Sequence, residues 1–307
     1  MKKKHPIIAV TGSSGAGTTT VTEAFKDIFR HNKLNAAIVT GDAFRRYDAD
    51  EMKQATAKAE ERGETISHFG PEANLFNELA DLFRDYSETG NGKMRHYVNE
   101  ENDDAHNQSA GSFTPWEDTP DSDLLFYEGL HGGVVSAHWT RRNMSPSHNV
   151  RVKTERREAL DNEVDVAQYV DLLVGIVPVV NLEWIQKIDK VKKVKGFSAD
   201  SVTESILNNL NDYIHFVVPQ FSYTDINFQR VPVVDTSNPF IARDVPSPEE
   251  SKIVIRFREP HKYDLPHIMG QIDTAFMSRP NTMVIPGGYL RHALGVICTP
   301  LIRELLD

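Results

Sequence analysis

A glycine-rich turn between a short strand-like run and a helical pattern constrains this chain more than any other feature. Residues 7–11 are mostly apolar and lead directly into Gly12, Gly15 and Gly17. From Thr18 onwards, apolar residues recur with helical spacing. In such a turn, successive backbone N–H groups and the helix dipole converge on an anion. The segment therefore predicts a buried strand, a phosphate-binding loop and a helix.

The loop nearly matches the nucleotide-binding pattern GxxxxGK[ST]. Gly12 and Gly17 have the required spacing, but Thr18 stands where the pattern has lysine. Thr19 stands where a hydroxyl would bind Mg²⁺. An ordinary turn is the alternative, and the missing lysine keeps it open. The residues predicted to hold the nucleotide are Gly12, Ser13, Ser14, Gly15, Ala16, Gly17, Thr18, Thr19 and Thr20.

Composition places the chain among ordinary globular proteins. Its 307 residues are 39% hydrophobic and 25% charged, and its formal net charge is −10. This acidic balance argues against nucleic acid as the main partner. Cys298 is the single cysteine and lies in an apolar run, which predicts a buried structural thiol. No apolar run approaches the length of a membrane span, so we expect a cytoplasmic protein with no membrane partner.

Apolar periodicity predicts alternating strands and helices, and hence an α/β fold. We expect a P-loop NTPase-like mixed sheet, mostly parallel, with helices on both faces of a single domain that spans residues 1–307. A polar, arginine-rich insertion is expected at about 138–163, either solvated or in contact with an anionic partner or another subunit. Strands are expected at 7–11, 35–40, 124–128, within 170–180, and at 231–235, 252–257 and 282–286; helices are expected at 18–29, 52–62, 71–86, 182–195 and from 289 onwards.

Two carboxylates follow predicted strands directly. Asp42 comes after the strand at 35–40, and Glu128 ends the strand at 124–128. Ligands of open α/β sheets bind at the carboxyl ends of the strands. Glu128 is therefore a candidate Mg²⁺ partner, and Asp42 is a candidate base for an acceptor hydroxyl. Each has a simpler explanation, since strands often end in Glu and Asp42 could cap the next helix.

Cationic side chains lie near both elements. Arg45 and Arg46 follow Asp42 and suit an anionic acceptor. The helix at 182–195 carries Lys187 and Lys190 on one face. It is either a cationic lid over phosphates or a solvated helix with an apolar inner face.

These motifs resemble the short, bacterial-type members of the phosphoribulokinase/uridine kinase family. The resemblance covers almost the whole chain except about 138–163. It rests on the segments GSSGAGTTT at 12–20, GDAF at 41–44, HF at 68–69, EAN at 72–74, FYEGLHG at 126–132, NLEWIQKI at 181–188 and NFQRVPVVDTSNPF at 227–240. Threonine in place of the loop lysine is a trait of that family.

The resemblance implies a P-loop kinase that transfers phosphate from ATP to ribulose 5-phosphate, with Mg²⁺, as a homo-oligomer. It implies that Asp42 is the catalytic base, that Thr19 and Glu128 serve the metal, and that Lys187 contacts phosphate as a catalytic residue. The residues expected near the sugar phosphate are Arg45, Arg46, Arg95, Tyr97, Lys190 and Lys195.

Several positions depart from the family pattern. Arg45 stands where many members have histidine, and Ala49, Asn99 and Val191 replace an arginine, a histidine and an acidic residue. Asn208 and Asn209 stand where the family has a pair of arginines linked to allosteric control. The residues that the resemblance assigns to ATP chemistry are all present in the sequence, whereas those assigned to acceptor recognition differ from the family pattern. The alternatives are therefore a kinase of another sugar phosphate or of a nucleoside such as uridine, and a nucleotide-sensing or assembly protein with little activity.

Overall fold

The computed structural model describes residues 5–12, 18–99, 108–136, 164–177, 179–193, 207, 209–238 and 244–307. The loop at 13–17, the insertion at 138–163, Lys195 and Asn208 lie outside these residues. In chain order the elements are β1 (Ile7–Gly12), α1 (Thr18–His31), β2 (Ala36–Thr40), α2 (Ala49–Glu60), α3 (Phe76–Thr89), β3 (Lys93–Met94), β4 (Glu117–Asp118), β5 (Leu124–Gly129), β6 (Leu172–Val177), α7 (Val180–Lys193), β7 (Ile226–Pro232), β8 (Ser251–Phe257), α9 (Leu265–Gly270), β9 (Phe276–Arg279), β10 (Thr282–Pro286) and α10 (Leu290–Leu306).

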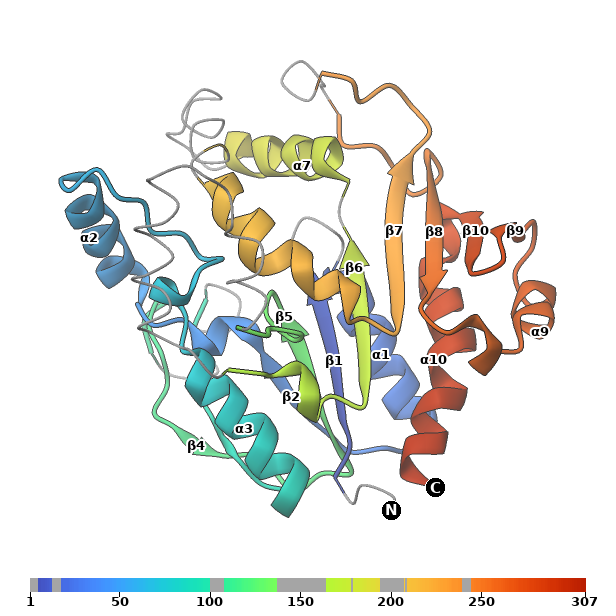
Figure 1. Cartoon of the computed structure of the whole chain (residues 1–307), viewed down its shortest axis with the longest axis horizontal. Helices are drawn as coiled ribbons and strands as arrows, with labels where there is room; N and C mark the ends of the chain where they lie inside the picture. Colours follow the sequence, from blue (N-terminus) through green and yellow to red (C-terminus); the bar gives the residue numbers. More distant parts are fainter. Residues whose placement is uncertain are drawn as a thin grey trace.

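Within the described residues, eight strands form one sheet in the order β2, β5, β1, β6, β7, β8, β10, β9 (Figure 1). The first five are parallel, and β8, β10 and β9 continue the sheet in antiparallel pairs. This arrangement confirms the predicted mixed, mostly parallel sheet. The parallel half brings the carboxyl ends of β2, β5 and β1 together at one edge.

Each face of the sheet packs against its own helices. Successive residues of a strand point to opposite faces, so β1 sends Ile8 and Val10 to one core and Ile7 and Ala9 to the other. The first core includes the apolar faces of α1 and α10, and the second includes that of α3. Helices therefore cover both faces, as predicted.

Two predicted helices have different boundaries in the structure. The helix predicted at 52–62 is α2, which begins at Ala49 because Asp48 caps it in a reciprocal capping box with Glu51. The helix predicted at 71–86 is a short 3₁₀ turn at Pro71–Ala73 followed by α3. The two are separate because the Asn74 side chain donates hydrogen bonds to the carbonyls of His68 and Gly70 (3.0 and 2.7 Å) and draws the chain into a bend.

The strand predicted at 231–235 has the wrong bounds. β7 spans Ile226–Pro232, and its first residues are the ones that pair with both β6 and β8. The apolar run at 231–235 misled the prediction, because Val233 and Val234 are exposed beyond the strand. The run predicted within 170–180 forms β6, but its last residue begins α7. The short α9 and β9 were missed.

Two further sequence predictions concern the thiol and the membrane. Cys298 is fully buried in α10, and burial raises its pKa to about 12, which confirms a structural thiol. Among the helices that the structure describes, none is long and apolar enough to cross a membrane.

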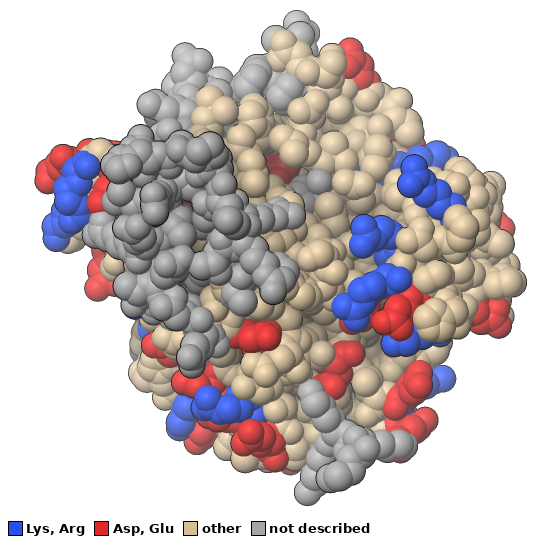
Figure 2. All heavy atoms as spheres, in the orientation of Figure 1, with Lys and Arg blue, Asp and Glu red and all other residues tan. Residues whose placement is uncertain are grey.

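Figure 2 shows acidic and basic side chains interspersed around the rim of one face of the molecule.

Candidate active site

The sheet brings the end of β1 and both carboxylates to one edge. β5 lies between β1 and β2, and Glu128 is in register with Val10 of β1 and Thr40 of β2. β1 ends at Gly12, where the predicted phosphate loop begins in the sequence, and Asp42 follows Thr40, so all three positions lie at the carboxyl ends of neighbouring strands. This edge is where open α/β sheets bind their ligands.

Close backbone contact fixes the two carboxylate segments against each other. A Cβ on Gly41 would lie 2.9 Å from the Cα of Gly129, and one on Gly129 would lie 2.7 Å from the Cα of Gly41. Either Cβ would also lie 2.6 Å from the Tyr127 hydroxyl. Glycine is therefore required at both positions. Since Asp42 follows one glycine and Glu128 precedes the other, their backbones are held side by side.

Asp42 is a half-exposed carboxylate on a 3₁₀ turn, Gly41–Phe44. The N-cap of α2 is Asp48, so the alternative that Asp42 caps that helix is wrong. Burial raises the pKa of the Tyr127 phenol, and the charges of Glu128 and Asp42 raise it further. Both carboxylates therefore lie within electrostatic reach of the same phenol.

The donors at this edge suit a hard cation. Glu128 and Asp42 offer carboxylate oxygens, which Mg²⁺ prefers, and Mg²⁺ sites commonly use one or two protein carboxylates together with substrate phosphates. In the described part of the chain, no group of three or more His, Cys, Asp or Glu side chains is arranged to hold a metal ion. The residues present thus fit a metal held jointly with a nucleotide.

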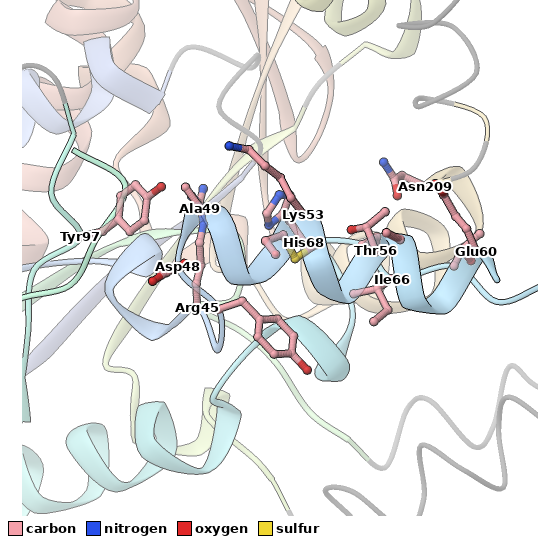
Figure 3. Close-up of a pocket in the computed structure, with 15 residues that line it drawn as sticks. Arg45, Asp48, Ala49, Lys53, Thr56, Glu60, Ile66, His68, Tyr97 and Asn209 are labelled. Carbon is pink, nitrogen blue, oxygen red and sulfur yellow. The ribbon is translucent and has the colours of Figure 1, made fainter. Parts of the chain in front are cut away.

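A cavity of about 940 Å³ lies along one face of α2 (Figure 3). Arg45 and Tyr97 line it, as does the turn at 65–68 on the opposite side. The α2 residues that face it recur every three or four positions, which is one helix face. They are Ala49, Met52, Lys53, Thr56, Ala57 and Glu60, and the N-cap residue Asp48 lines the cavity with them.

Arg45 connects this cavity to Asp42. Its guanidinium is paired with the Asp42 carboxylate, with 2.7 Å between Nη2 and Oδ1, and lies 4.9 Å from the centre of the Tyr97 ring. Arg45 and Tyr97 were both predicted near the acceptor, and the structure brings them together at the cavity.

Arg95 and Arg46 bind backbone carbonyls instead. Arg95 donates to the carbonyls of Ala43 and Arg45 (2.8 and 2.6 Å). Arg46 donates to the carbonyls of Glu72 and Asn74 (3.1 and 3.0 Å). Arg95 thus holds the backbone that follows Asp42, and Arg46 ties its own segment to residues 72–74. Neither arginine lines the cavity that the structure describes.

The predicted lysines lie on or beyond α7. This helix follows β6 and so starts from the same edge of the sheet (Figure 1). Lys187 and Lys190 belong to α7, and Ile185 and Ile188 are buried on its inner face. The side chains of Lys187, Lys190, Thr18 and Thr19 lie outside the description, as do Lys195 and the loop at 13–17. Their predicted roles stay predictions.

The sequence alone did not identify Lys53, His68 or Asn209 as site residues, although all three line the cavity. The helical spacing of Ala49, Lys53 and Thr56 was a possible signal, but nothing in the sequence indicated what that face lines. His68 is partly exposed, yet desolvation by the surrounding protein and the Arg45 cation lower its pKa to about 4, against a smaller opposing effect of Asp42. His68 is therefore neutral at physiological pH.

Comparison with known proteins identifies the family of the chain. The sequence profile of the Phosphoribulokinase / Uridine kinase family matches residues 7–237. The chain is 48% identical over 310 residues to "Phosphoribulokinase, chromosomal" of Cupriavidus necator, covering 100% of this chain and 98% of that one. It is 47% identical over 309 residues to the "Probable phosphoribulokinase" of Escherichia coli, with the same coverage.

A solved structure agrees as well. Phosphoribulokinase from Rhodobacter spheroides superimposes with a TM-score of 0.84 at 45% identity, covering 99% of this chain and 98% of that one. These matches confirm the predicted family, its P-loop kinase fold and its phosphotransferase class. The chain belongs to the phosphoribulokinase/uridine kinase family.

Proposed function

We propose that the protein transfers the γ-phosphoryl group of ATP to the 1-hydroxyl of D-ribulose 5-phosphate. The observation that carries the proposal is the meeting, at one sheet edge, of the end of β1 at Gly12, Glu128 and Asp42, together with a cavity lined by Arg45, the ion-pair partner of Asp42. A volume of about 940 Å³ accommodates a pentose phosphate. The names of the full-length relatives point to the same acceptor.

In the proposed reaction, the 1-hydroxyl oxygen of the sugar attacks the γ-phosphorus, and its proton passes to the Asp42 carboxylate. The bond between the γ-phosphorus and the bridging oxygen breaks, and the electron pair leaves with ADP. Asp42 returns the proton to solvent. The turn at Gly41–Phe44 orients Asp42, since Arg95 holds the carbonyls of this segment.

Glu128 and the Thr19 hydroxyl would hold Mg²⁺, which, when bound, neutralises charge on the phosphates. Lys187 would contact the transferred phosphate, and Lys190 and Lys195 would assist from the same helix and its extension. Tyr97 would lie beside the acceptor, and Arg46 would support the site through the carbonyls of Glu72 and Asn74. We further propose that the protein acts in the cytoplasm as a homo-oligomer.

The test is ADP release with Mg-ATP and each of ribulose 5-phosphate, other pentose phosphates and uridine, in the wild type and in Asp42→Asn. The amide of this variant keeps the shape of the carboxylate but cannot accept a proton, so we expect kcat on ribulose 5-phosphate to fall by about 10²–10⁴-fold. The affinity for ATP should be unchanged. Turnover on uridine alone would overturn the proposed acceptor. Binding of ATP without turnover on any acceptor would instead support the nucleotide-sensing alternative.

A further inference from the structure

The ion pair between Arg45 and Asp42 poses a chemical problem for the proposed base. The Asp42 carboxylate must accept a proton from the acceptor, yet one of its oxygens is bound by Arg45 Nη2 at 2.7 Å. A carboxylate oxygen that accepts a hydrogen bond from a guanidinium is not available to the acceptor hydroxyl. This contact engages Oδ1 alone, so Asp42 would present both carboxylate oxygens to the acceptor hydroxyl only after Arg45 has moved away.

Arg45 also has a second place to bind. Its side chain is 26% exposed, lines the cavity and lies 4.9 Å from the centre of the Tyr97 ring. Its own backbone stays in place, because its N–H donates to the Asp42 carbonyl (3.2 Å) and its carbonyl accepts from Arg95 (2.6 Å). The guanidinium can therefore turn from Asp42 into the cavity without moving the turn that carries both residues.

A phosphate group in the cavity would draw Arg45 there. Among the described lining residues, the permanent cations are Arg45 and Lys53, and the carboxylates are Asp48 and Glu60. A phosphate dianion offers a guanidinium more charge than a carboxylate and accepts two parallel hydrogen bonds from it. Phosphate bound in the cavity would thus compete with Asp42 for Arg45.

We propose that Arg45 makes the activity of Asp42 dependent on the phosphate group of the acceptor. Without a phosphorylated acceptor, Arg45 holds the Asp42 carboxylate. When the acceptor phosphate enters the cavity, the guanidinium transfers to it and leaves Asp42 to accept the hydroxyl proton. This inference rests on the proposed function and adds to it a means of rejecting neutral acceptors such as uridine and unphosphorylated sugars.

The kinetic test divides the acceptor into two parts, D-ribulose and the phosphite dianion. In the wild type, turnover of ribulose should be slow, and phosphite should raise kcat/KM for ribulose about tenfold or more. In Arg45→Gln, ribulose should react faster than in the wild type without phosphite, and phosphite should have no effect. The same variant should raise KM for ribulose 5-phosphate by about 10–100-fold, as expected for a lost charged hydrogen bond.

Arg84→Gln is the matched control. Arg84 also pairs with an aspartate, Asp81 (2.6 Å), but it does not line the cavity. Its kinetics should match those of the wild type. If Arg45→Gln lowers turnover of ribulose and of ribulose 5-phosphate by the same factor, or if phosphite still activates it, the ion pair is purely structural and the inference fails.

A second measurement does not depend on turnover. Crystal structures of the wild type with and without ribulose 5-phosphate should show the contact between Arg45 and Asp42 only in the ligand-free form. A bound pentose phosphate with the 2.7 Å contact intact would overturn the inference even in an active enzyme. Failure of the proposed function would give a different result, because the wild type would then form no product from ribulose 5-phosphate.

Discussion

At the scale of single residues, Arg95 positions the site by binding the backbone next to Asp42. Its guanidinium donates to the carbonyls of Ala43 and Arg45, and it stacks on Phe113 at 3.6 Å and on Trp116 at 4.7 Å from the ring centres. Burial lowers its pKa, but a guanidinium remains charged. Both residues that we place closest to the acceptor proton, Asp42 and Arg45, are thus positioned by a third side chain.

Arg95→Lys tests this positioning role. An ammonium group cannot reproduce the planar fork or the stacking, so the turn at Gly41–Phe44 should loosen. We expect KM for ribulose 5-phosphate to rise and kcat to fall, together costing about 1.5–3 kcal/mol in kcat/KM. KM for ATP should stay near the wild-type value. Steady-state kinetics with each substrate varied in turn will measure this, with Arg84→Lys as control. Equal effects on both KM values would argue against a local role.

At the scale of elements, the sequence predicted the parts of the site that depend on local pattern. The strand and the helix at the start of the chain and the strand that ends near Glu128 were found because each has a local apolar run or a helical period. The cavity could not be found in this way. It is formed by α2, the turn at 65–68 and Asn209, and only tertiary packing brings these segments together. The predicted bounds of β7 were wrong for a related reason. Pairing with β6 and β8 determines where this strand lies, and it outweighs the apolar run that follows the strand.

The segment after β5 is fixed by a buried histidine. His131 lies against Phe76 with 4.7 Å between ring centres, and its Nε2–H donates to the carbonyl of Phe69 (3.1 Å). Burial lowers the pKa of His131 to about 4, from an ordinary value of 6.5, and the hydrogen bond to Phe69 opposes this only partly. His131 thus joins the segment that carries Glu128 to the turn beside the cavity, and it does so in the neutral form.

This histidine should make stability depend on pH. Because its pKa is lower in the folded protein, the unfolded chain binds more protons between pH 6.5 and 4. The stability that His131 contributes is therefore complete above pH 6.5 and declines as the pH falls towards 4. From pH 7 to pH 5 the loss should be about 2 kcal/mol. Urea unfolding at both values should show a smaller loss in His131→Gln, which keeps an N–H donor but does not titrate. An equal loss in both proteins would assign the effect to other groups.

At the scale of the whole molecule, one sheet organises both the site and the stability. Its order places β5 between β1 and β2, so segments far apart in the sequence supply one active-site edge. The same strands divide their side chains between two cores, one with α1 and α10 and the other with α3. A change in either core should therefore reach the site edge through the shared strands. The single domain remains a prediction from the sequence, and this continuity is a physical reason to expect it.

Cavity-forming substitutions on the two faces test that prediction. Leu294 of α10 is 0% exposed in one core, and Leu79 of α3 is 1% exposed in the other. Leu→Ala at either position should lower the free energy of unfolding by about 2–5 kcal/mol. If the chain is one cooperative unit, both variants should shift the same transition when it is followed by far-UV circular dichroism and by tryptophan fluorescence. Cys298→Ala, a smaller deletion in α10, should shift it less. A variant that splits the transition, so that one core unfolds while the other persists, would show that the two faces of the sheet fold as separate units.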